Sequence, residues 1–215
     1  MSVDVILPCL NERDALPWVL ARIPDGMHPL VVDNGSTDGS VAVAERLGAE
    51  VVMAPLRGYG AACAAGLRHS TSEVVVMLDC DASVDPAELP GLIEPVLQGE
   101  LDLVIGRRVP VGRGAYPLHL RIANRELARR LSRRTGTLIE DCGPVRVARR
   151  RLLLDLELRD QRSGYPAETV VKAAAAGHRI GQVPVSYRAR TGRSKVTGTP
   201  LGIWRAVRDS SAALR

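Results

Sequence analysis

The stretch Val74-Val75-Val76-Met77-Leu78-Asp79-Cys80-Asp81 joins five consecutive apolar residues to two acidic residues that are one position apart. An uninterrupted apolar run of this length is typical of a β-strand that is buried on both faces. Strands of that kind belong to parallel sheets that helices cover on each side. The stretch therefore predicts an α/β fold, with two carboxylates directly after a buried strand.

The segments before and after this stretch alternate between short apolar runs and helical patterns. Strands are predicted at 3–7, 30–33, 50–53 and 101–105, and helices at 15–22, 40–47, 59–69 and 86–97. This alternation, with short connections, predicts βαβ units and a mostly parallel central sheet flanked by helices. Ligands of such sheets bind beyond the carboxyl ends of the strands. We therefore expect the functional residues just after the strands.

The second half of the chain is less regular. A helix is predicted at 118–134, a strand or extended loop at 141–148, a helix at 165–176, a strand at 179–187 and a last helix at 200–214. No clean linker separates these segments from the first half. We expect a single domain, 1–215, in which residues 107–215 complete a cleft that residues 1–106 begin.

The composition limits the classes of function. The chain of 215 residues has a formal charge of +5, but Lys and Arg concentrate in 107–151 and 188–208, which favours a local anion site. Aromatic residues make up 3%, too few for the stacking platforms of a nucleic-acid-binding module. No targeting segment and no long apolar run is evident, and the four cysteines are widely spaced. We expect a cytoplasmic protein without a zinc site or disulfides.

Polar and acidic residues follow three of the predicted strands: residues 8–12 after the first, 33–40 after the second and 79–81 after the fourth. Paired carboxylates are ligands that suit Mg²⁺ or Mn²⁺, and such an ion can bridge a diphosphate. A D-x-D pair also occurs in solvated turns, and the Asn-Gly and Asp-Gly steps of 33–40 are turn formers. The position directly after a buried strand favours the metal-binding interpretation.

Together these motifs resemble glycosyltransferase family 2. They are P-x-x-N-E at 8–12, D-N-G-S-x-D-G-S at 33–40, R-G-Y-G-A-A at 57–62 and D-x-D at 79–81, in the order and spacing of that family. The G-R-R at 106–108 resembles the family's G-S-R, and 141–146 resembles its D-x-x-x-G-F-R with a shorter spacing. Residues 184–188 and 192–196 are similar to the basic tail of the dolichol-phosphate mannose synthase-like branch, which acts on polyprenyl phosphates.

The resemblance implies a GT-A fold with a Rossmann-like, nucleotide-binding first half, 1–106, and an acceptor-side half, 107–215. It implies an inverting transfer of a hexose from a UDP- or GDP-linked sugar, with Mg²⁺ or Mn²⁺ as cofactor. The expected acceptor is a polyprenyl phosphate, with peripheral contact at the inner face of the membrane. The alternatives are a soluble hydroxyl acceptor and a non-catalytic relative that binds the nucleotide-sugar. The nucleobase, the sugar and the oligomeric state stay open.

The resemblance also implies roles for individual residues. The donor side of the site consists of Pro8, Asn11 and Glu12 along the nucleotide, Asp33 at the base, Gly58 at a close approach to the nucleotide, Asp79 at ribose or metal, and Asp81 as the main metal ligand. Sugar or phosphate contacts fall to Arg107, Arg188, Arg190, Ser194 and Lys195. If the acceptor is a hydroxyl, a general base is needed, and the candidates are Asp141 and Glu168. Glu168 has an alternative interpretation as a helix N-terminal carboxylate.

Two other patterns leave alternatives open. The arginines of the predicted helix 118–134 recur at helical spacing, which fits either contact with anionic lipid headgroups or a solvated basic face. The partial G-x-G at 58–60 is a weak signal for a dinucleotide-dependent oxidoreductase, because it follows the third strand. A sugar-phosphate nucleotidyltransferase would need a Gly-rich, Arg-containing loop after the first strand, and residues 8–12 are not that.

Overall fold

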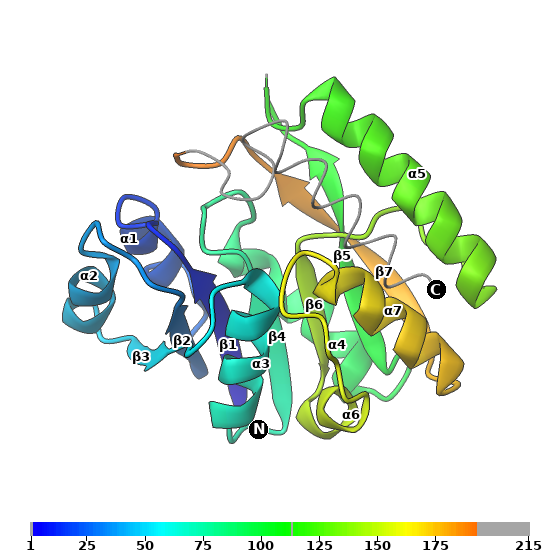
Figure 1. The fold of residues 1–215 in the computed structure, drawn as a ribbon, viewed down its shortest axis with the longest axis horizontal. Coiled ribbons are helices and arrows are strands. Elements are labelled where there is room, and N and C mark those ends of the chain that lie inside the picture. The colour runs from blue at the N-terminus through cyan, green and yellow to red at the C-terminus, as the bar shows by residue number, and fades with distance from the viewer. Residues whose placement is uncertain (1, 113, 193–215) are drawn as a thin grey trace.

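The computed structural model describes residues 2–112 and 114–192. Within these ranges the chain forms a mixed sheet of seven strands in the order β3-β2-β1-β4-β6-β5-β7, with helices on both faces (Figure 1). In chain order the elements are β1 (Val3–Cys9), α1 (Leu16–Leu20), β2 (Met27–Asp33), α2 (Ser40–Arg46), β3 (Glu50–Met53), α3 (Tyr59–His69), β4 (Val74–Leu78), η1 (Pro86–Glu88), α4 (Leu89–Leu97), β5 (Leu103–Pro110), α5 (Leu118–Thr135), β6 (Val145–Arg149), α6 (Arg150–Asp155), α7 (Tyr165–Ala175) and β7 (Ile180–Tyr187). The predicted α/β fold with a mostly parallel sheet is confirmed.

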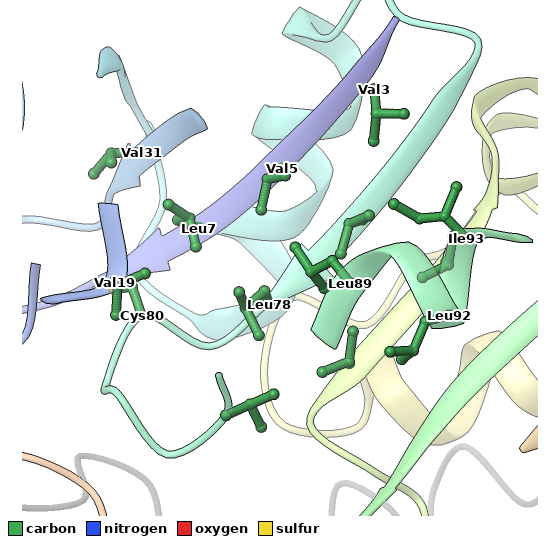
Figure 2. Packing of buried hydrophobic residues seen from close by; sticks show 14 of the residues in the cluster. Val3, Val5, Leu7, Val19, Val31, Leu78, Cys80, Leu89, Leu92 and Ile93 are labelled. Carbon is green, nitrogen blue, oxygen red and sulfur yellow. The ribbon is translucent and has the colours of Figure 1, made fainter. Parts of the chain in front are cut away.

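Side chains of the central strand β4 alternate between two hydrophobic cores. Val74, Val76 and Leu78 pack on the face that α1, α2 and α4 cover, and Figure 2 shows Leu78 beside the side chains of α4. Val75 and Met77 point to the opposite face, which α3, α5, α6 and α7 cover. Because both positions of the two-residue repeat are buried, both must be apolar. This explains why the strand is an uninterrupted apolar run.

One strand runs against the others. β6 lies between β4 and β5 and pairs antiparallel with both. β1 to β4 pair parallel with one another, and β7 pairs parallel with β5. Two reversals restore the direction, so β5 and β7 point the same way as β4. The carboxyl ends of all the strands except β6 therefore meet at one edge of the sheet.

Several element bounds differ from the sequence-based predictions. β5 continues to Pro110 instead of ending at residue 105, because it pairs with β7 over eight residues. The strand predicted loosely at 141–148 is Val145–Arg149, and the short helix α6 that follows was not predicted. Arginines interrupt the apolar pattern at both places, so the periodicity that marks the other elements is lost. The helix predicted at 200–214 lies outside the described residues.

The longest helix of the described residues is α5, which packs against α7 and forms an outer rim of the molecule (Figure 1). In the two described ranges, no helix combines the length and the apolar character needed to cross a bilayer.

Candidate active site

The loops after β1 and β2 are joined by hydrogen bonds from short polar side chains. The Asn11 side-chain oxygen accepts a bond from the Thr37 N–H at 2.7 Å, and the Asn11 N–H donates to Ser36 Oγ at 2.9 Å. The Glu12 N–H donates to Ser40 Oγ at 3.0 Å. Asn11 and Glu12, two of the predicted nucleotide-binding positions, thus belong to one surface at the carboxyl edge of the sheet, next to Pro8 near the end of β1.

The end of β2 supplies two buried polar residues to this surface. Asp33 is 1% exposed, and its carboxylate accepts hydrogen bonds from the N–H groups of Gly35 at 2.9 Å and Ser36 at 3.1 Å. The side chain of Asn34 accepts a bond from the Gly58 N–H at 2.7 Å. Asp33 therefore shapes the turn after β2, and Asn34 joins that turn to the loop after β3. The contact between Asp33 and a base stays a prediction.

The first turn of α3 lies directly against the backbone of residues 160–162. A Cβ atom at Gly58 would lie 2.0 Å from the carbonyl oxygen of Gln161, and one at Gly60 would lie 2.1 Å from that of Asp160. The Ala61 N–H donates to the Gln161 carbonyl at 3.0 Å. The close approach that Gly58 permits in this structure is thus to another part of the chain. Gly60, which the sequence analysis did not select, has the same steric requirement.

The acidic pair after β4 lies against the loop after β1. Cys80 Sγ donates to the carbonyl oxygen of Pro8 at 3.1 Å. Asp81 is buried, and its Oδ2 lies 2.5 Å from Nη2 of Arg190. Asp79 is partly exposed. The segment that carries the two carboxylates therefore touches the predicted nucleotide loop, and of the two side chains Asp81 is shielded from bulk solvent.

The charges of this pair are only partly balanced. Burial and, secondly, the neighbouring charge of Asp81 raise the pKa of Asp79 to about 6, although the guanidinium of Arg190 acts in the opposite direction. A divalent cation with oxygen ligands would relieve the repulsion between the carboxylates. The described residues contain no group of three or more His, Cys, Asp or Glu side chains placed to hold a metal. A cation here would complete its shell with substrate oxygens or water.

The segment after β7 brings Arg190 to the acidic pair. The N–H of Arg188 donates to the Ser83 carbonyl at 2.8 Å, and the N–H of Thr191 donates to the Asp81 carbonyl at 2.9 Å. Residues 188–191 therefore run alongside the loop that carries Asp81. The other predicted residues of this basic tail, Ser194 and Lys195, lie outside the described residues.

Arg107 and Arg188 keep exposed guanidinium groups near the ends of the parallel strands β5 and β7. Arg107 Nε lies 3.3 Å from a carboxylate oxygen of Glu140, and its side chain is 37% exposed. Arg188 Nη2 lies 3.7 Å from Asp85, and its side chain is 48% exposed. Both guanidinium groups are exposed and their ion pairs are longer than about 3 Å, so either arginine can exchange its present partner for a ligand anion.

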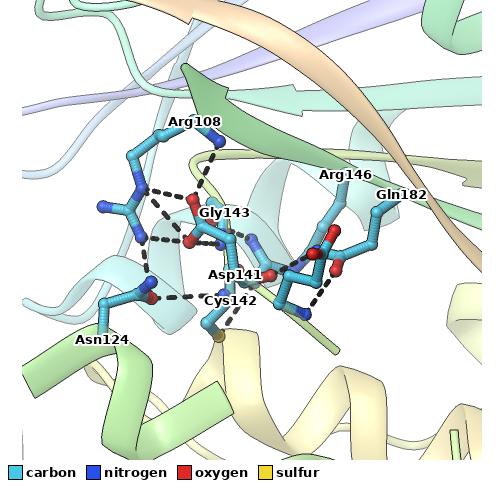
Figure 3. Close-up of polar contacts among 8 residues, drawn as sticks. Arg108, Asn124, Asp141, Cys142, Gly143, Arg146 and Gln182 are labelled. Carbon is cyan, nitrogen blue, oxygen red and sulfur yellow. Dashed lines mark hydrogen bonds and ion pairs between the residues drawn. The ribbon is translucent and has the colours of Figure 1, made fainter. Parts of the chain in front are cut away.

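Asp141 forms a buried ion pair that the sequence analysis missed (Figure 3). Its carboxylate lies 2.6 Å from Nη2 of Arg108 and accepts bonds from the N–H groups of Arg108 and Gly143, each at 2.8 Å. Asn124 Oδ1 accepts a further bond from Arg108 Nη2 at 3.0 Å. Burial by itself would raise the pKa of Asp141, but the hydrogen bonds and charge of Arg108 outweigh it, and the net pKa is lowered.

Two further arginine contacts hold this part of the structure. The guanidinium carbon of Arg108 lies 4.6 Å from the ring centre of Tyr116 and 5.4 Å from that of Tyr187. Arg146 is 1% exposed, and its Nη2 donates to the carbonyl oxygen of Cys142 at 2.5 Å. Arg146 therefore stabilises the turn that carries Asp141. The only sequence signals for these roles are the second Arg of G-R-R and the Arg that ends 141–146.

Glu168 lies in the first turn of α7 and accepts hydrogen bonds from the backbone of the preceding loop. The donors are the N–H groups of Arg159 at 3.0 Å and Asp160 at 2.7 Å, and Lys172 Nζ lies 3.0 Å away. Burial alone would raise the pKa of Glu168, but these bonds and the Lys172 charge lower it overall. Glu168 thus holds the segment that packs on the start of α3.

The fold is an α/β fold with a largely parallel sheet, and in such folds ligands bind in the crevice beyond the carboxyl ends of the strands. The chain belongs to glycosyl transferase family 2, because the model of that family matches residues 4–156. An uncharacterised glycosyltransferase of Mycobacterium tuberculosis is 47% identical over 97% of this chain and 95% of its own length. A dolichyl-phosphate hexose transferase of Haloferax volcanii is 34% identical over 91% of this chain and 86% of its own.

Solved structures agree on the GT-A type of fold. Glucosyl-3-phosphoglycerate synthase from Mycobacterium tuberculosis in complex with Mg²⁺ and uridine diphosphate has a TM-score of 0.79 and 27% identity, over 99% of this chain and 78% of that one. The same enzyme in complex with Mn²⁺, uridine diphosphate and glucosyl-3-phosphoglycerate has a TM-score of 0.78 and 27% identity, with the same coverage. This chain is thus a glycosyltransferase by family and by fold.

Proposed function

We propose that this chain is a metal-dependent, inverting hexosyltransferase that takes its sugar from a UDP-linked donor and transfers it to a hydroxyl of a small anionic acceptor. The observation that carries the proposal is the convergence of Asp79 and Asp81 with the loop after β1, through the Cys80–Pro8 hydrogen bond, and with Arg190. The similar synthase from Mycobacterium tuberculosis, solved with uridine diphosphate and Mg²⁺, supports the choice of nucleotide and metal.

Asp79 and Asp81 would hold the Mg²⁺ or Mn²⁺ ion, with Asp81 as the main ligand. The fit follows from the donor set, because two adjacent carboxylates with unbalanced charge are hard oxygen ligands that these ions prefer. The bound ion would neutralise negative charge on the departing nucleoside diphosphate.

The remaining donor-side residues bind and orient the nucleotide-sugar. Pro8, Asn11 and Glu12 would line the nucleotide, and Asp33 would face its base. Arg190, already beside Asp81, would add positive charge where the leaving group develops negative charge, and such preorganised charge is often the largest catalytic term. Gly58 would keep the backbone of the loop after β3 close to both the nucleotide and Gln161.

The choice of acceptor follows from the structural relatives. The synthase that resembles this fold was solved with glucosyl-3-phosphoglycerate, whose acceptor part is small, phosphorylated and hydroxyl-bearing. Arg107 and Arg188 have exposed guanidinium groups that could pair with an acceptor phosphate. This favours the soluble-acceptor alternative over the polyprenyl phosphate that the sequence motifs led us to expect first.

We propose positioning roles for the two carboxylates that the sequence analysis offered as general bases. Asp141 and Glu168 each accept hydrogen bonds from several donors, and each has a lowered pKa. An effective base has a pKa near the working pH and a free lone pair toward the acceptor. In our proposal Asp141 instead holds Arg108 on the acceptor side, and Glu168 holds the loop against α3.

A second candidate acceptor is a polyprenyl phosphate, which the Haloferax volcanii relative named dolichyl-phosphate hexose transferase favours. A phosphate acceptor is already ionised, so its attack needs no strong base. In either case we propose one domain with donor-binding residues in 1–106 and acceptor-binding residues in 107–215, working in the cytoplasm or at the inner face of the membrane.

The test is a thermal-shift screen of UDP- and GDP-sugars with and without Mn²⁺, followed by transfer assays with the stabilising donor. A ligand at about 100 times its Kd raises stability by about 2.7 kcal/mol, which such a screen detects. We expect a shift with a UDP-sugar that depends on Mn²⁺, and transfer to 3-phosphoglycerate but not to a short-chain polyprenyl phosphate. Transfer to the lipid alone would establish the second candidate, and a shift without transfer to any acceptor would support the non-catalytic relative. No shift with any nucleotide would refute the proposal.

A further inference from the structure

The solvent-facing side of α5 carries apolar side chains at its beginning. Leu118 is 69% exposed and Ile122 is 62% exposed, and because they are four residues apart they lie on the same helix face. The connection that leads into the helix adds Val109 at 42% and Val111 at 47% exposure. Exposed aliphatic residues gathered in this way mark a surface that another body covers.

The same helix is strongly cationic. Exposed arginines continue the outer face along its length: Arg121, Arg125, Arg129, Arg130, Arg133 and Arg134. Glu126 pairs with two of them, Arg129 and Arg130, within the helix. In the described part of the chain the other four have no carboxylate partner in an ion pair, so the face keeps a large positive charge.

The position of this surface relative to the site follows from the strand directions. β5 points the same way as β4, because β6 runs antiparallel to both. Val109 and Val111 therefore lie at the carboxyl edge of the sheet, the edge that carries Asp79 and Asp81. The apolar beginning of α5 is thus on the rim that faces the same side as the proposed active site.

We propose that this rim binds the surface of an anionic lipid bilayer. The rim consists of the apolar residues Val109, Val111, Leu118 and Ile122, with Arg121 and Arg125 beside them. Apolar side chains that enter the headgroup region next to cations that pair with lipid phosphates form the usual interfacial arrangement. A nucleic acid would use the cations but not the aliphatic residues, and the exposed large apolar residues of the described chain include no aromatic ring for stacking. The proposal is independent of the sugar donor and of the acceptor.

The test is co-sedimentation of the full chain with vesicles of phosphatidylcholine containing roughly 30% phosphatidylglycerol, compared with pure phosphatidylcholine. We expect binding to the anionic vesicles that weakens between about 0.1 M and about 0.5 M salt. Arg121→Glu with Arg125→Glu should reduce the affinity at least about tenfold. Leu118→Asp with Ile122→Asp should reduce the affinity similarly at low salt, because the apolar contact with the bilayer is lost. Both side chains are exposed, so these substitutions should leave the fold intact.

The matched control is Arg46→Glu with Leu47→Asp, a cation and an exposed leucine at the end of α2, on the opposite side of the molecule (Figure 1). This variant should bind vesicles like the original chain. Equal loss in the control and the α5 variants would overturn the proposal, as would binding to an RNA oligonucleotide without binding to vesicles. A dimer that Ile122→Asp dissociates, again without vesicle binding, would assign the surface to a second copy and also overturn it.

Discussion

The guanidinium of Arg190 acts on both Asp79 and Asp81, and that of Arg146 acts on Asp79 as well. Arg190 Nη2 lies 2.5 Å from Asp81, whereas burial and the charge of Asp81 keep the pKa of Asp79 raised despite the nearby guanidinium groups. Two carboxylates that interact in this way disfavour each other's charged form, and a divalent cation would relieve the effect. At the scale of single residues, the site is thus organised around an unbalanced negative charge at the end of a buried strand.

This charge leads to a prediction for Asp81→Ala. Mn²⁺-dependent transfer should fall by about 10³-fold or more, because the main oxygen ligand for the ion is lost at the position where leaving-group charge develops. Initial rates over a Mn²⁺ titration measure this loss. Asp14→Ala removes a carboxylate that is 78% exposed and should change neither rate nor melting temperature. Unchanged turnover in Asp81→Ala would refute the metal assignment.

Residues were predictable from the sequence where the signal is local. Asp79 and Asp81 could be selected because they directly follow an apolar run, which places them at a strand end. Arg108 and Asn34 could not, because their roles depend on Asp141, 33 residues away, and on Gly58, 24 residues away. Asp141 and Glu168 were selected as acidic, but the donors that surround them come from tertiary structure. The role of a residue whose partners are distant in the sequence cannot be predicted from a local sequence pattern.

Among the elements, β1 and β4 are joined at their beginnings by Asp4. Its carboxylate accepts bonds from Ser70 Oγ at 2.5 Å, the Thr71 N–H at 3.0 Å and Ser72 Oγ at 2.7 Å. Burial alone would raise the pKa of Asp4, but these bonds lower it overall. The contact lies at the amino ends of the strands, far from the proposed site, so it concerns stability and not catalysis.

The lowered pKa of Asp4 predicts a pH-dependent stabilisation. Asp4→Asn should lower the free energy of unfolding near pH 7 by about 1–3 kcal/mol, because an amide cannot accept all of these bonds. A depressed pKa stabilises the fold above the unfolded value of about 4, and this stabilisation is lost as the pH falls through the folded value. Urea unfolding from pH 7 downward should therefore show the two proteins converging below about pH 4. If the free energies of unfolding of the original chain and Asp4→Asn differed by the same amount at every pH, this explanation would be wrong.

A second prediction at this scale concerns the packing of α3. Gly60→Ala should lower the free energy of unfolding by about 1–3 kcal/mol, because its Cβ would lie 2.1 Å from the Asp160 carbonyl oxygen. Gly91→Ala in α4 is the matched control, since no atom lies within 4 Å of its added Cβ, and it should be neutral or stabilising by up to about 1 kcal/mol. Chemical denaturation of both variants measures the difference. Equal stability of the two would show that residues 160–162 do not lie against α3.

The elements themselves were predictable to different degrees. The first five strands and the helices between them follow from short apolar runs and the turn residues that separate them, and the central strands β1 and β4 are buried on both faces. β6 could be located only loosely and its antiparallel direction not at all, because direction depends on which strands it pairs with. β5 is longer than its apolar run because backbone pairing with β7 extends it through Arg107 and Arg108.

At the scale of the whole molecule, function and stability occupy opposite edges of one sheet. The carboxyl edge gathers the loops 8–12, 33–40 and 79–84, together with residues 188–191, by hydrogen bonds between segments distant in sequence. The amino edge gathers structural contacts such as those of Asp4. Parallel strands produce this division, because their carboxyl ends leave a crevice where the connections diverge.

The division predicts where hydrogen exchange will slow when donor and metal bind. With UDP and Mn²⁺, backbone amides in 8–12, 33–40, 79–84 and 188–191 should gain protection, since bound ligand stabilises the loops that contact it. Amides of 70–72, at the amino edge, should exchange as before, which provides an internal control in the same sample. If donor-binding residues lie in 1–106 and acceptor-binding residues in 107–215, as proposed, residues 107–149 should gain protection only after an acceptor is added. Protection concentrated at the amino edge would refute the site, whereas protection of both halves by UDP and Mn²⁺ alone would refute only the division between them.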